Sequence, residues 1–351
     1  SATSHVAILA RARGVPMVVG VPLPDIAPGT EVALDADAGR VTLAPTPATA
    51  HSFRARIAAA APEAARAAEA AHSPAVTRTG RPVRVLINVD DPALLDTLDP
   101  GICDGIGLVR TEFLFEGGTL PDEDTQAAIY ARILRWAAGR PVTIRSLDAG
   151  GDKPIPGVTL DGETNPFLGV RGLRLSLRTP ALFRTQLAAI ARAAALGPVK
   201  LMLPMVTVPA ELAEAAAHLD AVLADLAARG APHARPALGI MVETPAAALR
   251  AADFPADFYS IGSNDLIQYV TACARDNPHL SALADPMNPA VLDLIARTIE
   301  AGRTRGAEVS LCGDMASSPA LVPVLLGLGL GVFSVAPAQV GRVKLAIGAA
   351  D

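Results

Sequence analysis

Polar residues follow several apolar runs in the second half of the sequence. Glu243 ends the run in "GIMVET", Asn264 and Asp265 end the run in "FYSIGSND", and Cys312 ends the run in "VSLCGD". Burying an ionised carboxylate at the end of a strand is costly unless the group has a partner. Two carboxylates on consecutive strands suit a hard cation such as Mg²⁺, which prefers oxygen ligands and keeps positions for water and substrate.

Basic residues follow two earlier apolar runs. Arg110 lies in "GLVRTEF", Arg145 lies in "PVTIRSLD", and Lys153 follows in "AGGDK". Guanidinium groups offer forked donors that match phosphate or carboxylate. Each arginine taken alone is as typical of a structural ion pair as of a ligand site. Together with Glu243 and Asp265, they indicate a site for a small, multiply anionic substrate that binds through magnesium.

The elements that must position these residues recur with a regular period after residue 83. Apolar runs alternate with helical patterns, many of which have a proline near the start and a glycine past the end. Continuous apolar strands between helices indicate a parallel sheet covered on both faces, and eight such units predict a (β/α)8 barrel, with an open doubly wound sheet as the alternative. The runs are 83–90, 105–113, 141–148, 199–208, 238–244, 258–265, 309–314 and 331–337. In a barrel, the carboxyl ends of the strands form the active-site face, so the polar residues are expected to converge there.

The first 80 residues have a different pattern. Residues 1–46 contain short β-rich runs separated by turn signals, which predicts a small β-containing unit. Residues 47–80 are rich in alanine and predict a helical linker, with a bend at Pro62. The barrel is then expected to occupy residues 81–351.

Composition excludes several classes of function. The chain has 351 residues, of which 51% are hydrophobic and 3% aromatic, and its net charge is -5. This charge argues against a nucleic-acid or anionic-membrane surface. Three widely spaced cysteines do not form a disulfide framework or a metal cluster and favour a reducing, cytoplasmic compartment. The uncharged segment 319–340 contains spaced prolines and glycines, which favours a buried helix and strand over a membrane span.

Six motifs occur in a fixed order: "GLVRTEFLF", "IRSLDAGGDKPIP", "NPFLGVRGLR", "IMVETPAAA", "SIGSNDLIQY" and "LCGDMA". In this order they resemble the phosphoenolpyruvate-binding barrel of enzyme I, the phosphoenolpyruvate–protein phosphotransferase of the bacterial sugar phosphotransferase system. The segment "TSHVAILARARGVPMVVG" resembles the family's phosphohistidine segment. The resemblance covers nearly the whole chain and implies a TIM barrel preceded by part of a small, swivelling phosphohistidine domain.

The resemblance also implies roles for individual residues. His5 matches the histidine that accepts the phosphoryl group, and imidazole is nucleophilic near neutral pH. Cys312 matches the thiol that protonates the enolate to give pyruvate. Glu243 and Asp265 match the ligands of Mg²⁺, for which Mn²⁺ is a substitute. The implied substrate-binding residues are Arg110, Arg145, Lys153, Arg171, Asn264, Asp265 and Arg275, whereas Cys103 and Cys273 have no such position.

Partners and assembly follow from the same resemblance. It implies phosphoenolpyruvate as substrate, transfer to the phosphocarrier HPr as the first step of sugar uptake, and a cytoplasmic homodimer formed through the barrels. Only four residues precede His5, so the portion that docks HPr is expected to lie outside this chain, and the chain also ends early. Asp314 stands where the family usually has Glu.

Two other functions stay open at the level of sequence. Pyruvate phosphate dikinase and phosphoenolpyruvate synthase share the barrel and the phosphohistidine, although no nucleotide-grasp domain is visible here. The chain could also be a non-catalytic regulatory or dimerisation module that binds phosphoenolpyruvate without passing phosphate on.

Overall fold

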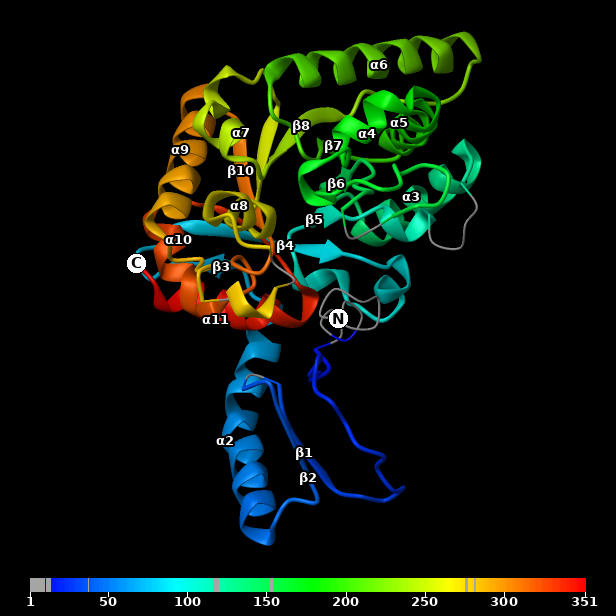
Figure 1. The fold of residues 1–351 in the computed structure, drawn as a ribbon. Helices are drawn as coiled ribbons and strands as arrows, with labels where there is room; N and C mark the ends of the chain where they lie inside the picture. The colour runs from blue at the N-terminus through cyan, green and yellow to red at the C-terminus, as the bar shows by residue number, and fades with distance from the viewer. Residues whose placement is uncertain are drawn as a thin grey trace.

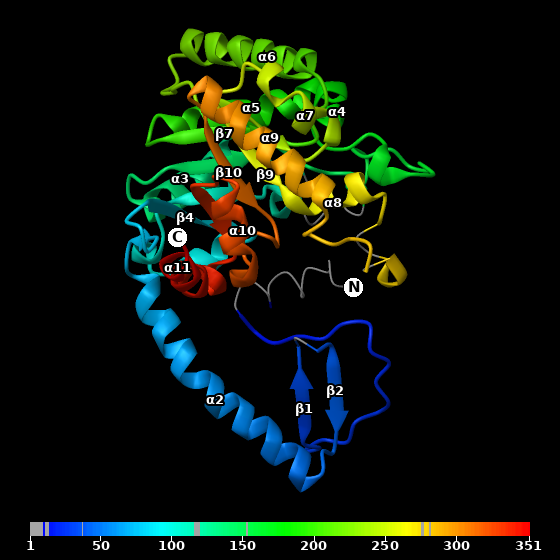
Figure 2. The ribbon, with the colours of Figure 1, turned by 90° about the vertical axis from the view of Figure 1, so that its left-hand side faces the viewer.

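The structure is a computed structural model that describes residues 10, 14–36, 38–115, 120–151, 154–274, 277–280 and 282–351. Figure 1 shows a barrel from which one long helix, α2 (Pro47–Ala71), projects like an arm. A hairpin of β1 (Val32–Asp35) and β2 (Arg40–Leu43) lies beside this arm, as the view in Figure 2 confirms. The β-containing unit and the helix predicted for the first part of the chain are both present.

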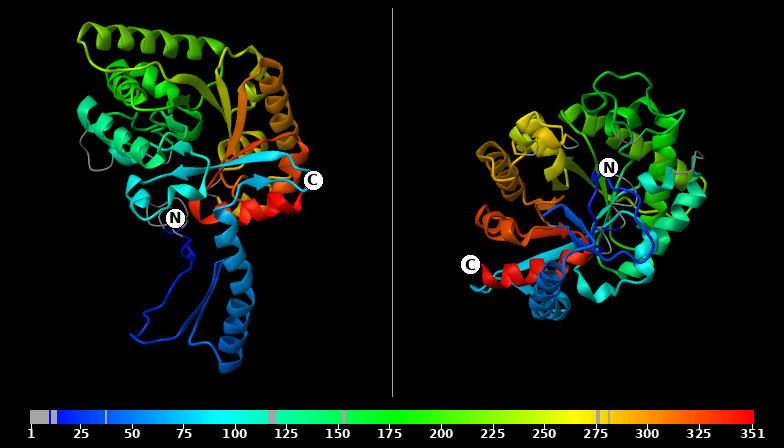
Figure 3. Two further views of the ribbon diagram at one scale, coloured as in Figure 1. Left: turned by 180° about the vertical axis from the view of Figure 1, so that it is seen from behind. Right: turned by 60° about the horizontal axis from the view of Figure 1, so that its bottom comes forward.

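Within the described residues, eight parallel strands close into a barrel in chain order, because the last of them, β11, pairs with the first, β4. The rotated views in Figure 3 show helices around the outside of these strands. The predicted (β/α)8 architecture is therefore confirmed and the open sheet is excluded. The barrel strands are β4 (Pro82–Val89), β5 (Ile106–Val109), β6 (Val142–Arg145), β7 (Val199–Leu203), β8 (Ala237–Val242), β9 (Phe258–Gly262), β10 (Glu308–Cys312) and β11 (Val332–Val335).

Helix α9 begins and ends with residues typical of helix caps. In α9 the Asn288 side chain accepts a hydrogen bond from Ala290 N at the start, and Gly306 ends the helix with a left-handed φ of +66°. The helices around the barrel are α3 (Glu123–Ala137), α4 (Leu173–Arg178), α5 (Pro180–Ala194), α6 (Pro209–Ala228), α7 (Pro245–Leu249), α8 (Ser263–Thr271), α9 (Pro289–Arg305), α10 (Val322–Gly327) and α11 (Val340–Ala349). Short 3-10 turns lie at 92–96, 100–102, 112–115, 166–168, 251–253, 278–280, 319–321 and 337–339.

The linker helix is shorter than the range predicted for it. α2 runs through Pro62 and ends at Ala71. It ends there because Pro74 follows closely, and a proline disfavours helical backbone at the residue before it. The chain then forms β3 (Ala75–Val76), which pairs antiparallel with the start of β4. The linker is thus a helix followed by a short strand that is fastened to the barrel.

The core has two layers, as expected for a barrel. Aliphatic side chains fill the space between strands and helices, and a separate cluster fills the barrel interior with Leu108, Met202, Met241, Phe258 and Cys312. The uncharged segment 319–340 forms a 3-10 turn, α10 and β11, in agreement with the prediction of a buried helix and strand. Among the described helices, none combines the length and apolar character that a membrane span requires.

The end of α2 is fixed to the barrel through α11. Gly341 packs so closely against α2 that a Cβ atom there would lie 1.8 Å from the Ala67 carbonyl oxygen. Lys344, one turn further, donates from Nζ to the carbonyl oxygens of Ala71 at 2.6 Å, Ser73 at 2.9 Å and Ile102 at 2.8 Å. The glycine provides the close approach and the lysine satisfies carbonyls at the end of α2.

We expect Gly341→Ala to lower the free energy of unfolding by about 3 kcal/mol, because the new methyl group would force α2 and α11 apart. Gly348→Ala on the same helix is the matched control. A Cβ atom there would come no closer than 3.9 Å to Val76 O, so alanine should change stability by less than about 1 kcal/mol through helix propensity. Urea unfolding of both variants measures the difference. Equal stabilities would contradict the close packing.

Candidate functional site

The polar residues predicted to converge do lie at one end of the barrel. Arg145 is the last residue of β6, Glu243 follows β8, Asp265 lies in the first turn of α8 directly after β9, and Cys312 is the last residue of β10. Because the strands are parallel, their carboxyl ends form one rim. The site is therefore assembled from residues that are far apart in the sequence.

Asp148 joins two arginines in the interior of this rim. Its Oδ2 lies 3.0 Å from Arg145 Nη1 and 2.9 Å from Arg171 Nη2. Arg171 also reaches Asp265 Oδ1 with Nη1 at 3.1 Å. Arg145, Arg171, Asp148 and Asp265 are all buried. Burial works against both guanidinium charges, but the neighbouring carboxylates outweigh it and raise the pKa of each arginine.

Glu112 holds Arg145 from the other side. Its Oε1 accepts from Arg145 Nη2 at 2.8 Å and from the backbone N–H of Asp148 at 3.1 Å. Among the described residues, the buried Nε of Arg145 has no hydrogen-bond partner. A buried donor of this kind suits an anionic ligand, since leaving it unpaired costs free energy.

Glu243 is a buried carboxyl group with only one fixed partner among the described residues. Its Oε1 accepts from Met205 N at 2.7 Å, and the residue is 1% exposed. Burial, followed by repulsion from Asp265 and Asp148, raises the pKa of Glu243 to about 8. Two carboxyl groups that repel each other in a buried site fit a divalent cation, which would relieve the repulsion.

Among the described residues, this cluster contains two guanidinium groups and four carboxyl groups. The described residues contain no group of three or more histidine, cysteine or acidic side chains placed to hold a metal ion. A cation at Glu243 and Asp265 would thus take its remaining ligands from water or substrate, as Mg²⁺ commonly does. The six residues are Glu112, Arg145, Asp148, Arg171, Glu243 and Asp265.

Cys312 presents a buried thiol at the same rim. Ser260 Oγ donates to Cys312 Sγ at 3.7 Å, and the thiol in turn lies 3.5 Å from the Ile261 carbonyl oxygen. Burial raises the pKa of Cys312, while the contact with Ser260 and the charge of Arg110 act in the opposite direction. The thiol is therefore protonated at neutral pH, as a proton donor requires.

Two further predicted residues have partners at the rim. Arg110 Nη1 contacts Asp90 Oδ1 at 2.6 Å, and chiefly this carboxylate raises the pKa of Arg110. Asn264 Oδ1 accepts from Asp314 N at 3.0 Å, and Asn264 Nδ2 lies 3.4 Å from Asp314 Oδ2. The acid that replaces the usual glutamate thus bonds to Asn264, two residues beyond Cys312.

Three predicted site residues, His5, Lys153 and Arg275, lie outside the described residues. Cys103 and Cys273 are both buried, and their thiols donate to nearby carbonyl oxygens, Cys103 to Pro100 at 3.9 Å and Cys273 to Thr271 at 3.2 Å. The sequence analysis missed the acidic partners of the arginines. Glu112 lies two residues after Arg110, and Asp148 lies three residues after Arg145. An acidic residue two or three positions after an arginine at the end of a strand could have predicted these partners.

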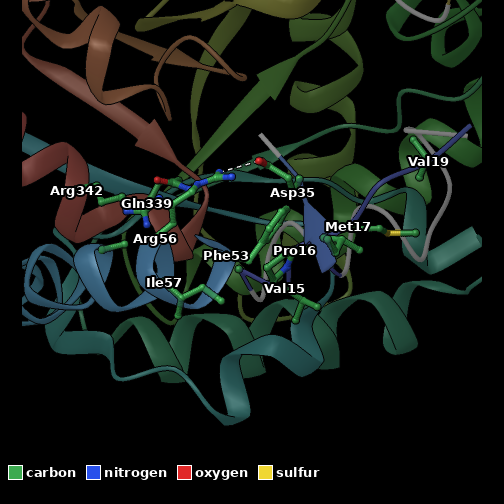
Figure 4. Close-up of a pocket in the computed structure, with 14 residues that line it drawn as sticks. Val15, Pro16, Met17, Val19, Asp35, Phe53, Arg56, Ile57, Gln339 and Arg342 are labelled. Atoms are coloured by element: carbon green, nitrogen blue, oxygen red, sulfur yellow. Dashed lines mark hydrogen bonds and ion pairs between the residues drawn. The ribbon is translucent and has the colours of Figure 1, made fainter. Parts of the chain in front are cut away.

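A groove of about 690 Å³ lies elsewhere in the molecule (Figure 4). It is lined by residues of the N-terminal segment, the hairpin, α2 and the beginning of α11, including Met17, Asp35, Phe53, Arg56 and Arg342. None of the strand-end residues lines it. The groove is thus separate from the buried charges at the barrel mouth.

Comparisons with known proteins agree with the geometry. Residues 64–351 match the family described as "PEP-utilising enzyme, PEP-binding domain", and residues 1–39 match "PEP-utilising enzyme, mobile domain", where PEP is phosphoenolpyruvate. The chain is 41% identical to the phosphoenolpyruvate-protein phosphotransferase of Haloferax volcanii, over 99% of this chain and 62% of the relative. It is 43% identical to the multiphosphoryl transfer protein of Rhodobacter capsulatus, over 97% of this chain and 41% of that protein. The chain thus spans about 60% or less of these relatives.

We expect the titration of the Glu243 carboxyl group to make the stability of the metal-free protein depend on pH. Its folded pKa of about 8 lies above the ordinary value of 4.5 for a glutamate carboxyl group, so between these pH values the unfolded chain binds fewer protons and stability falls as pH rises. Glu243→Gln removes this titration and keeps an acceptor for Met205 N. The Tm of the parent minus that of the variant should therefore decrease between pH 5 and pH 8 in EDTA. Parallel Tm curves would show that Glu243 does not titrate there.

Proposed function

Because the chain belongs to the family of PEP-utilising enzymes, we propose that its barrel binds phosphoenolpyruvate and transfers the phosphoryl group to His5. The bond between phosphorus and the enol oxygen breaks, its electron pair stays on that oxygen, and a phosphorus–nitrogen bond forms with the imidazole. The products are phosphohistidine and the enolate of pyruvate. Phosphoryl transfer of this kind depends mainly on positioning and charge neutralisation.

The arginines hold the anionic substrate in this proposal. Arg145, with its buried and unpaired Nε among the described residues, contacts the phosphate together with Arg110. Arg171 completes the basic lining and holds Asp265 in place at 3.1 Å. Lys153, Asn264 and Arg275 are further substrate ligands, which we assign from the resemblance alone.

Glu243 and Asp265 hold Mg²⁺, or Mn²⁺ in its place, together with the substrate. When bound, the cation neutralises negative charge on the phosphate. Other residues of the chain orient the two carboxyl groups. Met205 N donates to one oxygen of Glu243, and Arg171 donates to one oxygen of Asp265. The raised pKa of Glu243 supports a cation at this place, since burial and then repulsion from Asp265 and Asp148 disfavour its carboxylate form when no cation is bound.

Cys312 donates its thiol proton to the methylene carbon of the enolate, which yields pyruvate. The thiolate then regains a proton from solvent. Its location at the end of β10 and its raised pKa support this role, because the thiol carries a proton at neutral pH.

The observation that carries the proposal is the buried cluster in which Asp148 bridges Arg145 and Arg171 beside two carboxyl groups, Glu243 and Asp265. Such a cluster has no use in packing alone, because a buried charged network costs desolvation energy that apolar residues would not. It supplies fixed positive charge for phosphate next to acidic ligands for a cation.

For the longer protein we propose the place of enzyme I in sugar uptake. The phosphoryl group passes from His5 to the phosphocarrier HPr, which docks on a part outside this chain, in the cytoplasm and within a homodimer formed through the barrels. In this scheme residues 1–46 are the end of the phosphohistidine domain, residues 47–80 the linker and residues 81–351 the barrel. The names of the relatives support the scheme.

Substitutions at Cys312 and Arg145 separate chemistry from binding. Cys312→Ala should bind phosphoenolpyruvate about as well as the parent, because the thiol adds no charge to the site, yet pyruvate release should fall at least about 100-fold. Arg145→Ala should weaken binding at least about tenfold, because a charge-assisted contact is lost. Calorimetric titration of this chain and pyruvate release by a full-length protein containing it measure the two effects.

Cys103→Ala is the matched control, because Cys103 is also buried but its thiol points to the carbonyl oxygen of Pro100 at 3.9 Å. This control should keep both binding and turnover. If Cys312→Ala releases pyruvate at the parental rate, the thiol is a packing residue and its proposed role is wrong.

A further inference from the structure

A chain of buried polar side chains connects the outer helices to the barrel mouth. Gln186 lies on α5, Tyr130 lies on the neighbouring helix α3, and Thr111 follows β5. Figure 1 shows α3 and α5 side by side outside the barrel. Gln186 is 2% exposed, and the other two are fully buried. Buried polar groups of this kind require partners, since each unpaired group costs free energy.

The amide of Gln186 makes three hydrogen bonds. Its Oε1 accepts from Leu147 N at 2.9 Å, and its Nε2 donates to Thr111 Oγ1 at 3.1 Å and to Tyr130 Oη at 3.3 Å. Both N–H groups and the oxygen of the side chain are therefore used. All three contacts form in only one position and one orientation of the amide.

The two hydroxyl groups set the direction of these bonds. Thr111 Oγ1 donates its proton to the carbonyl oxygen of Arg145 at 3.0 Å, and Tyr130 Oη donates to Gln126 Oε1 at 3.2 Å. Each hydroxyl group has a single proton, so each must accept from the amide of Gln186. The orientation of the amide follows from this network and does not depend on how its oxygen and nitrogen are assigned.

The residues that Gln186 contacts follow the arginines of the site in the sequence. Thr111 follows Arg110, while Leu147 lies between Arg145 and Asp148 in the sequence. The amide thus ties the end of β5 to the end of β6. Through Leu147 it also fixes the backbone that carries Asp148, the bridge to Arg171.

We infer that Gln186 is a positioning residue that sets the spacing of Arg110 and Arg145 for phosphate, a role that rests on the proposed function for the identity of the ligand. A methionine of similar length would fill the same space between α3 and α5 without burying an amide. The amide instead fixes the positions of the two segments that follow β5 and β6, through Thr111 and Leu147. This matters because a displacement of a charged group by about 1 Å is enough to impair binding and catalysis.

The test compares Gln186→Met with Tyr130→Phe in this chain. The first variant removes all three contacts, whereas the second removes only the outer hydroxyl group and keeps the bonds to Thr111 and Leu147. Both should lower Tm, because each leaves a buried polar group without its partner. Gln186→Met should raise the Kd for phosphoenolpyruvate with Mg²⁺ about tenfold or more, and Tyr130→Phe should leave it within about twofold.

Thr111→Val provides a second variant in case Gln186→Met folds poorly. It breaks the inner link to the Arg145 carbonyl oxygen and should weaken binding to a similar extent. The double variant should bind no worse than either single variant, since both act through one contact. Additive losses would contradict a shared pathway. A Kd within about twofold of the parent for Gln186→Met, or an equal loss of affinity for Tyr130→Phe, would overturn the inference.

A ligand-free measurement separates this inference from the proposed function. The guanidinium ¹⁵N resonances of Arg145 should shift in Gln186→Met and stay unchanged in Tyr130→Phe. If the parent chain fails to bind phosphoenolpyruvate while the resonances shift as expected, the proposed function fails and the positioning role stands. If the resonances of Arg145 do not move in Gln186→Met, the positioning role is wrong.

Discussion

The carboxylate of Asp148 is the contact on which the rest of the site depends. Two buried guanidinium groups, those of Arg145 and Arg171, would repel each other and pay a large desolvation cost, but Asp148 lies within 3.0 Å of both. Glu112 in turn holds the backbone of Asp148 in place, because the N–H of Asp148 donates to Glu112 Oε1. Strand order, burial and hydrogen bonding therefore act together, and removing this one charge would leave two buried cations without a bridge.

Around this bridge, the described part of the chain places four carboxyl groups beside two guanidinium groups. The pKa of Glu243 is raised to about 8 because of burial and because Asp265 and Asp148 are close. The mutual repulsion of Glu243 and Asp265 would be relieved by a divalent cation, and a cation together with the arginines would attract a polyanionic ligand. The same site thus contains opposite charges at fixed positions, which is what stabilisation of a developing phosphoryl charge requires. The protonated thiol of Cys312 completes the set at the neighbouring strand end.

The sequence was informative where one segment determines its own structure. Apolar runs alternating with capped helices predicted the barrel and placed Arg145, Glu243 and Cys312 at its carboxyl rim, because strand ends can be read from the chain. It was less informative where partners come from different segments. The pairing of Arg171 with Asp148 and Asp265, and the reach of Gln186 from α5 to Thr111, depend on how helices pack against the strands. α2 ends before the predicted boundary because Pro74 disfavours helical backbone at the residue before it. The placements of His5, Lys153 and Arg275 still rest on the resemblance of their motifs.

The central claim is that Glu243 and Asp265 hold a cation that brings phosphoenolpyruvate to the buried arginines. A calorimetric titration of the chain with phosphoenolpyruvate, carried out once with Mg²⁺ and once in EDTA, tests it most directly. We expect saturable binding at one site with Mg²⁺, a loss of affinity of at least about 100-fold in EDTA, and the same loss in Asp265→Asn with Mg²⁺ present. Equal affinity with and without the cation, or undiminished binding by Asp265→Asn, would contradict the account.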